Sequence, residues 1–252
     1  MRLRLSRYFA MTVLFLLAVA GHGNDAEQAD SLQIVVYGAT GKVGTHVVDE
    51  ALARGHFVTA VSRDPSRIRQ QHENLSAVAG DLLDVESVTT LAMDKDVVII
   101  SVRGIIGKSK NPEDAIQRIA VEKVVDALRE IGDDAARLIH VGGSGSLEVE
   151  PGVLFADRIP KLFLPKELEL EIQGQVLALE YLRTVTDVKW SYATPARKFT
   201  NAKRTGVFRI GGDELLEDSS GKSRISRADF AVALIDEAEN ATHVRKRFSV
   251  AY

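Results

Sequence analysis

Residues 33–44 read QIVVYGATGKVG, and this stretch decides the fold of the 252-residue chain. The compact run of Val and Ile before the first glycine predicts a strand that is buried on both faces. The apolar periodicity of residues 43–53 predicts a helix directly after the glycines. A glycine-rich turn between a strand and a helix is typical of the first unit of a parallel α/β sheet.

The glycines of this turn have the spacing G-x-x-G-x-x-G, and each is expected to have its own role. Gly38 permits a tight turn, Gly41 lets backbone amides approach a pyrophosphate, and Gly44 lets the helix pack closely on the strand. The helix N-terminus adds partial positive charge. We therefore predict that a dinucleotide binds through Gly38, Ala39, Thr40, Gly41, Lys42, Val43 and Gly44. The alternative is that the glycines only shape a turn.

Outward from this stretch, short strands rich in Val and Ile alternate with amphipathic helices. The predicted strands are residues 33–37, 57–62, 75–79, 97–101, 137–141 and 189–193. The predicted helices between them are residues 43–53, 85–93, 114–131 and 172–183, with Pro112 placed to start the third. This alternation and right-handed crossovers predict a doubly wound, mostly parallel, Rossmann-like α/β sheet.

The C-terminal third departs from this alternation, and we expect it to form a small region that caps the substrate cleft. Its predicted elements are a strand or hairpin over 204–210 with a turn at Gly211 and Gly212, a helix from a Ser226–Asp229 cap to about Glu239, and a last strand over 247–251.

The residues at the end of the second predicted strand indicate which dinucleotide binds. Ser62 and Arg63 stand where NAD-selective folds place an Asp or Glu. A guanidinium there favours a 2'-phosphate, and Lys42 and Arg67 are expected to add to the positive charge. We therefore expect NADP(H), with NAD as the other option. The alternative is that Arg63 only pairs with Asp64 or a neighbouring acid at the surface.

Further candidate residues follow the later strands, because ligands of such sheets bind at the carboxyl ends of the strands. Asp81 and Leu82 are expected at the adenine edge, although Asp81 is also suited to capping the following turn. Ser101 and Arg103 follow the fourth strand and are expected near the nicotinamide.

Candidate catalytic residues come after the fifth strand and in the C-terminal third. The hydroxyls of Ser144 and Ser146 are expected to orient the carboxamide or a substrate carbonyl, unless this Gly/Ser-rich turn serves shape alone. Arg204 is the candidate in the C-terminal third, with a lone surface arginine as the alternative. His140 and Trp190 are expected in the core.

Composition limits the classes of partner. With 45% apolar and 27% charged residues the chain can bury one substantial core. A net charge of −3 gives no basic footprint, so we expect no nucleic-acid partner. The lack of cysteine excludes disulfides and thiolate ligands, and the six histidines show no ligand spacing, so we expect no metal site. A homo-oligomer is left open.

The N-terminal residues have the three-part layout of a secretory signal peptide. Arg2, Arg4 and Arg7 precede an apolar run over residues 8–20, which ends in a small-x-small site and is short for a membrane span of about 20 residues. We expect 1–20 to be a cleaved signal peptide, 21–31 a linker and 32–252 the NAD(P)-binding Rossmann-like domain. The protein would then be periplasmic or secreted, without a stable membrane span in the mature chain. An uncleaved anchor, or a misassigned start and a cytoplasmic protein, are the alternatives.

Beyond the glycine turn, several segments resemble the atypical short-chain dehydrogenase/reductase superfamily, in its NAD(P)H-binding, NADH-flavin reductase-like and NmrA-like branch. The resemblance covers residues 33–252. Its most distinctive segments are Val141 to Leu147, Trp190 to Tyr192 with Pro195, Arg204 to Gly206, Ser223 to Phe230 and Arg247 to Tyr252. The resemblance implies that Arg204 lies near the cleft and holds an anionic acceptor.

One departure from the wider superfamily bears on chemistry. Ordinary members use a Tyr-x-x-x-Lys pair for proton transfer, but the residues four positions after Tyr37, Tyr181 and Tyr192 are Gly41, Val185 and Ala196. The resemblance therefore implies an NAD(P)H-dependent oxidoreductase that reduces a flavin such as FMN or FAD, a quinone or a similar planar acceptor. The alternatives are a non-catalytic NADP(H)-binding sensor or scaffold, and a nucleotide-sugar epimerase or dehydratase.

Overall fold

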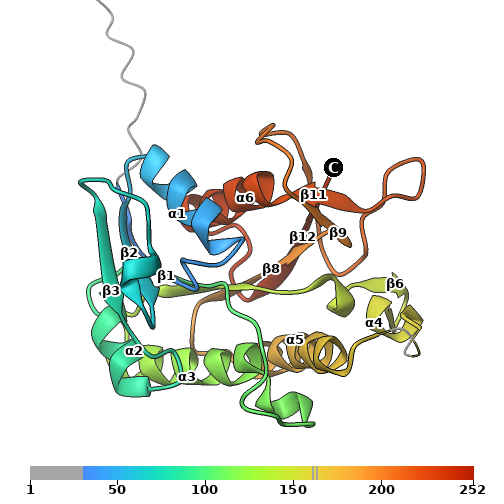
Figure 1. The fold of residues 1–252 in the computed structure, drawn as a ribbon, viewed down its shortest axis with the longest axis horizontal. Helices are drawn as coiled ribbons and strands as arrows, with labels where there is room; N and C mark the ends of the chain where they lie inside the picture. Colours follow the sequence, from blue (N-terminus) through green and yellow to red (C-terminus); the bar gives the residue numbers. More distant parts are fainter. Residues whose placement is uncertain (1–30, 161, 163) are drawn as a thin grey trace, which may run out of the picture. The chain divides into compact units, whose positions relative to one another are not determined.

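An eight-stranded sheet runs through the computed structural model, which describes residues 31–160, 162 and 164–252 (Figure 1). Its strand order is β10-β12-β8-β5-β4-β1-β2-β3, and all neighbours are parallel except the antiparallel pair β10 and β12. The strands are β1 (Gln33–Tyr37), β2 (Phe57–Ser62), β3 (Leu75–Ala79), β4 (Val97–Ile100), β5 (Arg137–Val141), β8 (Trp190–Pro195), β10 (Arg209–Gly211) and β12 (Lys246–Ala251). The predicted signal peptide and all but the last residue of the predicted linker lie outside the described residues.

Helices cover both faces of this sheet, as a doubly wound fold requires (Figure 1). One face carries α1 (Gly44–Ala53) and α6 (Arg227–Asn240), and the other carries α2 (Val85–Ala92), α3 (Ile116–Ile131) and α5 (Lys166–Thr184). Alternate residues of β1 serve the two cores: Val36 packs toward α1 and α6, whereas Val35 and Tyr37 pack toward α2 and α3. None of the helices in the described part of the chain is both long and apolar enough to cross a membrane.

The predicted strands and helices are confirmed to within a few residues, with three differences. Pro112 begins a 3-10 turn, η2 (Pro112–Asp114), and the long helix starts only at Ile116. α5 starts six residues before the prediction, because its first turn has acidic residues that suit a helix N-terminus but lack the apolar period. The strand predicted over 204–210 is wrong for most of its length, since only Arg209–Gly211 pairs as β10.

The physical reason for the last difference is Asp229, which is fully buried at the start of α6. Its carboxylate accepts hydrogen bonds from the backbone N–H groups of Thr205 and Gly206, both at 2.7 Å, and from the Tyr252 hydroxyl at 2.6 Å. These bonds hold the segment before β10 on the helix instead of in the sheet. The predicted cap is confirmed, because Ser226 Oγ accepts from the Asp229 N–H at 2.9 Å.

Several short elements lie in the connections between the main strands and helices. The sequence did not predict them. They are η1 (Pro65–Arg67), η3 (Ser144–Ser146), the hairpin of β6 (Glu148–Glu150) and β7 (Val153–Leu154), α4 (Phe155–Arg158), and the parallel pair β9 (Lys198–Thr200) and β11 (Arg224–Ser226).

Candidate functional site

The glycine turn after β1 is shaped by two positions at which no side chain fits. Gly38 has φ +78°, and a methyl group there would overlap the carbonyl oxygen of Ser101. A methyl group on Gly44 would overlap the carbonyl oxygen of Gly38, so the first turn of α1 rests directly on the end of β1. This is the tight turn and the close helix packing expected for the two glycines.

The polar groups of this turn are only partly satisfied within the chain. The Gly41 N–H donates to the Gly38 carbonyl at 2.8 Å, and the Thr45 hydroxyl donates to the carbonyls of Ala39 and Gly41 at 3.1 and 2.9 Å. Within the described residues, no acceptor is bound by the N–H groups of Thr40, Lys42 and Val43. These donors stand at the start of α1, where the helix dipole favours an anion.

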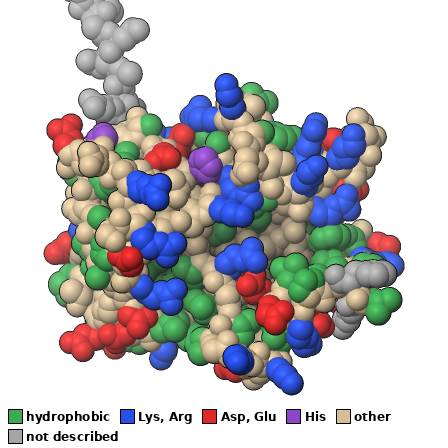
Figure 2. Space-filling model, viewed as in Figure 1, with side chains coloured by type: hydrophobic (Ala, Val, Ile, Leu, Met, Phe, Trp, Pro, Cys, Tyr) green, Lys and Arg blue, Asp and Glu red, His purple; other side chains and the backbone are tan. Residues whose placement is uncertain are grey.

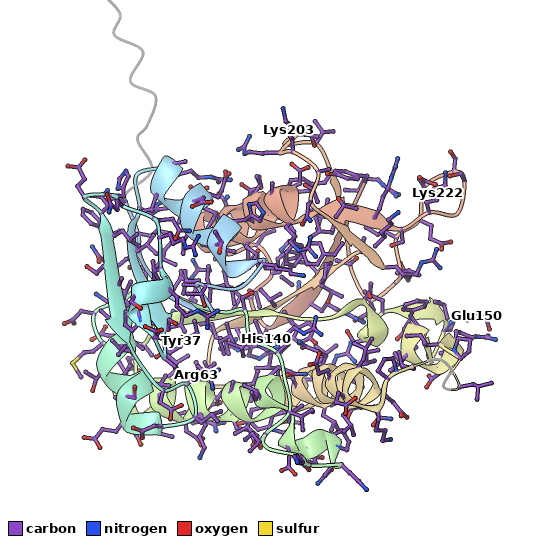
Figure 3. All side chains as sticks on the ribbon, viewed as in Figure 1. Tyr37, Arg63, His140, Glu150, Lys203 and Lys222 are labelled. Carbon is purple, nitrogen blue, oxygen red and sulfur yellow. The ribbon has the colours of Figure 1, made fainter. Side chains whose placement is uncertain are left out.

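The three cations expected beside this turn, Lys42, Arg63 and Arg67, have no ion-pair partner in the described part of the chain. Arg63 is exposed at the end of β2, near Tyr37 (Figure 3), and Lys42 and Arg67 are also exposed. Within the described residues Arg63 pairs neither with Asp64 nor with another acid, and Oδ1 of Asp64 accepts from the Ser66 hydroxyl at 2.6 Å. The structure therefore leaves positive charge uncompensated next to unpaired amides.

Three more candidate residues make contacts within the chain: Ser62, Asp81 and Leu82. Ser62 Oγ accepts from the Asp64 N–H at 3.2 Å. Asp81 Oδ1 accepts from the Leu83 N–H at 2.9 Å, which is the turn-capping role given as its alternative. Leu82 is buried in the core. The other carboxylate oxygen of Asp81 forms no hydrogen bond within the described residues.

The two residues after β4 have different surroundings. Ser101 contributes its backbone carbonyl to the packing against Gly38. Arg103 reaches across to α5 and forms an ion pair with Glu171 at 2.8 Å. Its side chain stays 73% exposed, so this pair is a surface contact of small energetic value.

The serines after β5 are not equivalent. Ser146 is buried, its hydroxyl donates to the Gly143 carbonyl at 2.9 Å, and its own carbonyl accepts from Arg247 at 2.6 Å. The hydroxyl of Ser144 is half-buried and forms no hydrogen bond with the described residues. Ser144 is thus the serine that has a group to offer a ligand, whereas Ser146 holds the turn together.

Arg204 is placed differently from the expectation of an anion-binding residue in the cleft. Its guanidinium binds the Glu50 carboxylate of α1 through two hydrogen bonds of 2.9 Å. Burial alone would raise the pKa of Glu50, but the hydrogen bonds from Arg204 and Arg54 hold it below its usual value. Glu50 is therefore charged at neutral pH and occupies the Arg204 guanidinium.

A half-buried amide that sequence reasoning missed lies against the turn after β5. Gln175 of α5 accepts from the Tyr192 hydroxyl at its carbonyl, 2.8 Å away, and its Oε1 lies 3.0 Å from Nε2 of His140. Burial lowers the pKa of His140 to about 4, so the imidazole is neutral at pH 7. His140 is a core residue as predicted, and so is Trp190, which donates to the Val185 carbonyl at 2.9 Å. An amide on a helix belongs to no motif that would have pointed to Gln175.

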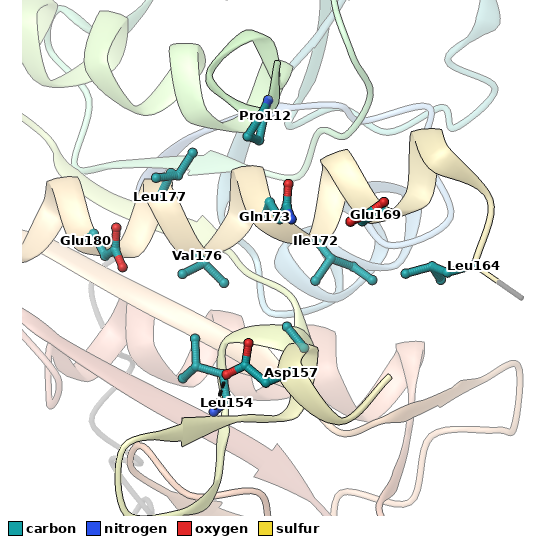
Figure 4. Close-up of a pocket in the computed structure, with 11 residues that line it drawn as sticks. Pro112, Leu154, Asp157, Leu164, Glu169, Ile172, Gln173, Val176, Leu177 and Glu180 are labelled. Carbon is teal, nitrogen blue, oxygen red and sulfur yellow. Dashed lines mark hydrogen bonds between the residues drawn. The ribbon is translucent and has the colours of Figure 1, made fainter. Parts of the chain in front are cut away.

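A cavity of about 280 Å³ opens between α4 and α5, beside this second turn (Figure 4). Its walls include the apolar side chains of Leu154, Ile172 and Val176, and carboxylates such as Asp157 and Glu180 also line it. A methyl group on Gly145 would overlap Ile172, which places the backbone of the turn against this wall. Among the described residues, no group of three or more His, Asp and Glu is arranged to hold a metal ion.

Comparison with known proteins agrees with this geometry. A family model described as NAD(P)H-binding matches residues 38–241, from the first glycine of the turn to the end of α6. Three solved structures each cover 88% of this chain. A Burkholderia pseudomallei protein provisionally named as exported has 33% identity and a TM-score of 0.73 over 100% of its length. A Bacteroides thetaiotaomicron protein provisionally named an epimerase has 30% identity and a TM-score of 0.77 over 97%.

The third structure is a Streptococcus pneumoniae protein provisionally named an NADH-flavin reductase, with 28% identity and a TM-score of 0.69 over 99% of its length. The family match includes the open turn, most of the parallel sheet and the helices on both of its faces. The chain accordingly belongs to the NAD(P)H-binding family, in the atypical short-chain dehydrogenase/reductase and NmrA-like branch.

Proposed function

We propose that this protein is a reductase that uses NADPH to reduce a flavin, a quinone or a similar planar acceptor. The observation that carries the proposal is the turn after β1, where three backbone N–H groups and the exposed cations Lys42, Arg63 and Arg67 have no partner among the described residues. Amides at a helix N-terminus suit a pyrophosphate, and a guanidinium beside them suits a 2'-phosphate. Family membership supports the nicotinamide dinucleotide as the ligand.

The nature of the acceptor is inferred from the proton chemistry of the chain. The sequence has no Tyr-x-x-x-Lys pair, and the Tyr192 hydroxyl is fully buried and donates to Gln175. Burial also raises the pKa of Tyr192, so this phenol is a poor proton donor to a substrate alkoxide. A reduced flavin or quinone takes its proton from solvent and does not need such a group.

When bound, NADPH supplies the hydride, and the work of the chain is to hold two ring systems face to face. We assign the diphosphate to the turn at residues 38–44, the 2'-phosphate to Arg63, and the orientation of the carboxamide or the acceptor to Ser144. The apolar walls of the neighbouring cavity favour a planar ring over a polar sugar. The Streptococcus neighbour's name supports this assignment, whereas the Bacteroides neighbour's name supports the epimerase alternative.

The test is calorimetric titration of NADPH and NADH, together with NADPH oxidation assays that use FMN, riboflavin and menadione as acceptors. We expect NADPH to bind more tightly than NADH. Arg63→Ala should lower the affinity for NADPH about tenfold and leave the affinity for NADH unchanged, because one charge-assisted contact to the 2'-phosphate is lost. Asp64→Asn is the matched control at the neighbouring surface position.

Each outcome selects a different account of the protein. Equal affinities for the two nucleotides in the wild type would remove the assignment of Arg63. Tight NADPH binding without turnover of any acceptor would select the sensor or scaffold function. Turnover of a nucleotide sugar without net NADPH oxidation would select the epimerase.

A further inference from the structure

Arg197 lies one residue past Ala196, where the chain leaves the carboxyl end of β8. β8 and β5 are parallel neighbours with Val141 paired to Ala193, so the residues that follow the two strands emerge at the same edge of the sheet. Arg197 therefore follows β8 at the edge where Ser144 follows β5. Its backbone is fixed there, because the Arg197 N–H donates to Ser223 Oγ at 3.1 Å.

The guanidinium of Arg197 is held over an aromatic ring that is tied to the turn after β5. It lies 5.7 Å from the ring centre of Phe155 in α4. The Phe155 N–H in turn donates to the carbonyl of Leu147 at 2.7 Å. A stacked guanidinium keeps its edge N–H groups free for a ligand, and it loses little freedom when one binds.

Other arginines near this edge already have a carboxylate. Arg103 pairs with Glu171, Arg204 with Glu50 and Arg247 with Asp213. Of these and Arg197, only Arg197 has no carboxylate partner within the described residues. It also stands in a basic region, since residues 197–227 contain eight Lys or Arg against four Asp or Glu, whereas the whole chain has a net charge of −3. Figure 2 shows Lys and Arg side chains gathered over the C-terminal elements.

We infer that Arg197 binds an anionic group of the acceptor, so that the preferred substrates are planar rings that bear a phosphate or a carboxylate. This inference rests on the proposed reductase function and replaces Arg204 with Arg197 as the anion-binding residue. The planar guanidinium suits bidentate binding of either anion. The carboxylates that line the α4–α5 cavity repel an anionic tail, so the tail is directed to the Arg197 side while the ring faces the apolar walls.

The test uses pairs of acceptors that differ in charge but share a ring. FMN and riboflavin form the phosphate pair, and a naphthoquinone carboxylate and its methyl ester form the carboxylate pair. We expect the wild type to have a lower KM for the anionic member of at least one pair. Arg197→Gln should raise that KM about tenfold and leave the KM of the neutral member unchanged, since one charge-assisted interaction is lost. The pair that responds identifies the anion.

Two further variants separate the role of Arg197 from general charge and from folding. Lys222→Gln removes one positive charge from an exposed loop of the same region and should change neither KM (Figure 3). Arg197→Lys keeps the charge but loses the planar fork, so its KM should fall between those of the wild type and Arg197→Gln. Thermal unfolding of each variant checks that the fold is intact.

Flavin fluorescence titrations of the NADP⁺-saturated protein give a readout that does not need turnover. Tighter binding of FMN than of riboflavin, lost in Arg197→Gln, would support the inference even if no acceptor is reduced. Equal KM values and equal affinities within both pairs would overturn it. In that case NADPH binding and riboflavin reduction would still stand as separate evidence for the proposed function.

Discussion

The glycine turn after β1 and the glycine turn after β5 both follow a buried parallel strand, yet their polar groups have different partners. In the first, the N–H groups of Thr40, Lys42 and Val43 have no acceptor in the described residues. In the second, the Ser146 hydroxyl donates to the Gly143 carbonyl, and the Ser146 carbonyl accepts from the Arg247 guanidinium. Glycine content alone therefore does not identify a ligand site. Unpaired donors beside unpaired cations are the better indication, because a helix N-terminus and neighbouring positive charge both favour an anion.

The largest expected effect comes from adding a methyl group at the tightly packed glycines of the two turns. Gly38→Ala would combine a positive φ with an overlap against Ser101, and we expect it to lower the free energy of unfolding by about 3 kcal/mol. It should also lower the affinity for NADPH more than 100-fold, which calorimetry would measure in protein shown to be folded.

Gly142→Ala is the matched change in the other turn, where the new methyl group would overlap the buried ring of Tyr192. We expect a comparable loss of stability in urea unfolding but a change in NADPH affinity of less than threefold. A variant at Gly212, where a methyl group meets nothing within 4 Å, should change neither quantity. If Gly142→Ala abolished NADPH binding and Gly38→Ala did not, the roles of the two turns would be exchanged.

A second prediction concerns His140 beneath the turn after β5. Burial lowers its pKa from 6.5 to about 4, so between these values the unfolded chain binds a proton that the folded chain does not. Stability should be fully present above pH 6.5 and should decrease as the pH falls toward 4, by about 2 kcal/mol between pH 7.5 and pH 5.

Urea unfolding at the two pH values measures this difference. His140→Gln should flatten the pH dependence, whatever it does to stability at pH 7.5. His72→Gln, a change at an exposed histidine, should retain the wild-type slope. An unchanged slope in His140→Gln would show that other groups are responsible.

The sequence was sufficient for the buried strands and the first turn because their signals are local. Val and Ile runs such as residues 97–100 bury both faces of a parallel strand, and the spacing of Gly38 and Gly44 directly reflects contacts between neighbouring segments. The hydrogen-bond partners of the arginine side chains could not be predicted in the same way. Arg204 binds Glu50 across 154 positions, and Arg247 binds Ser146 across 101. Such pairings depend on how the sheet is assembled, so neither motif nor resemblance could indicate that Glu50 binds the Arg204 guanidinium or that Arg247 binds the Ser146 carbonyl.

The smallest expected effect separates the two serines of the turn after β5. Ser146→Ala removes a buried hydrogen bond to Gly143 and should cost about 1 kcal/mol of stability, with kcat close to the wild-type value. Ser144→Ala removes a hydroxyl that has no partner in the described chain, so it should leave the free energy of unfolding unchanged within about 0.5 kcal/mol. If Ser144 orients the carboxamide or the acceptor, the same variant should lower kcat/KM about tenfold in the NADPH oxidation assay. Equal kinetics in Ser144→Ala and the wild type would instead mean that both turns contribute backbone alone, because the hydroxyl most available to a ligand would then have no measurable role.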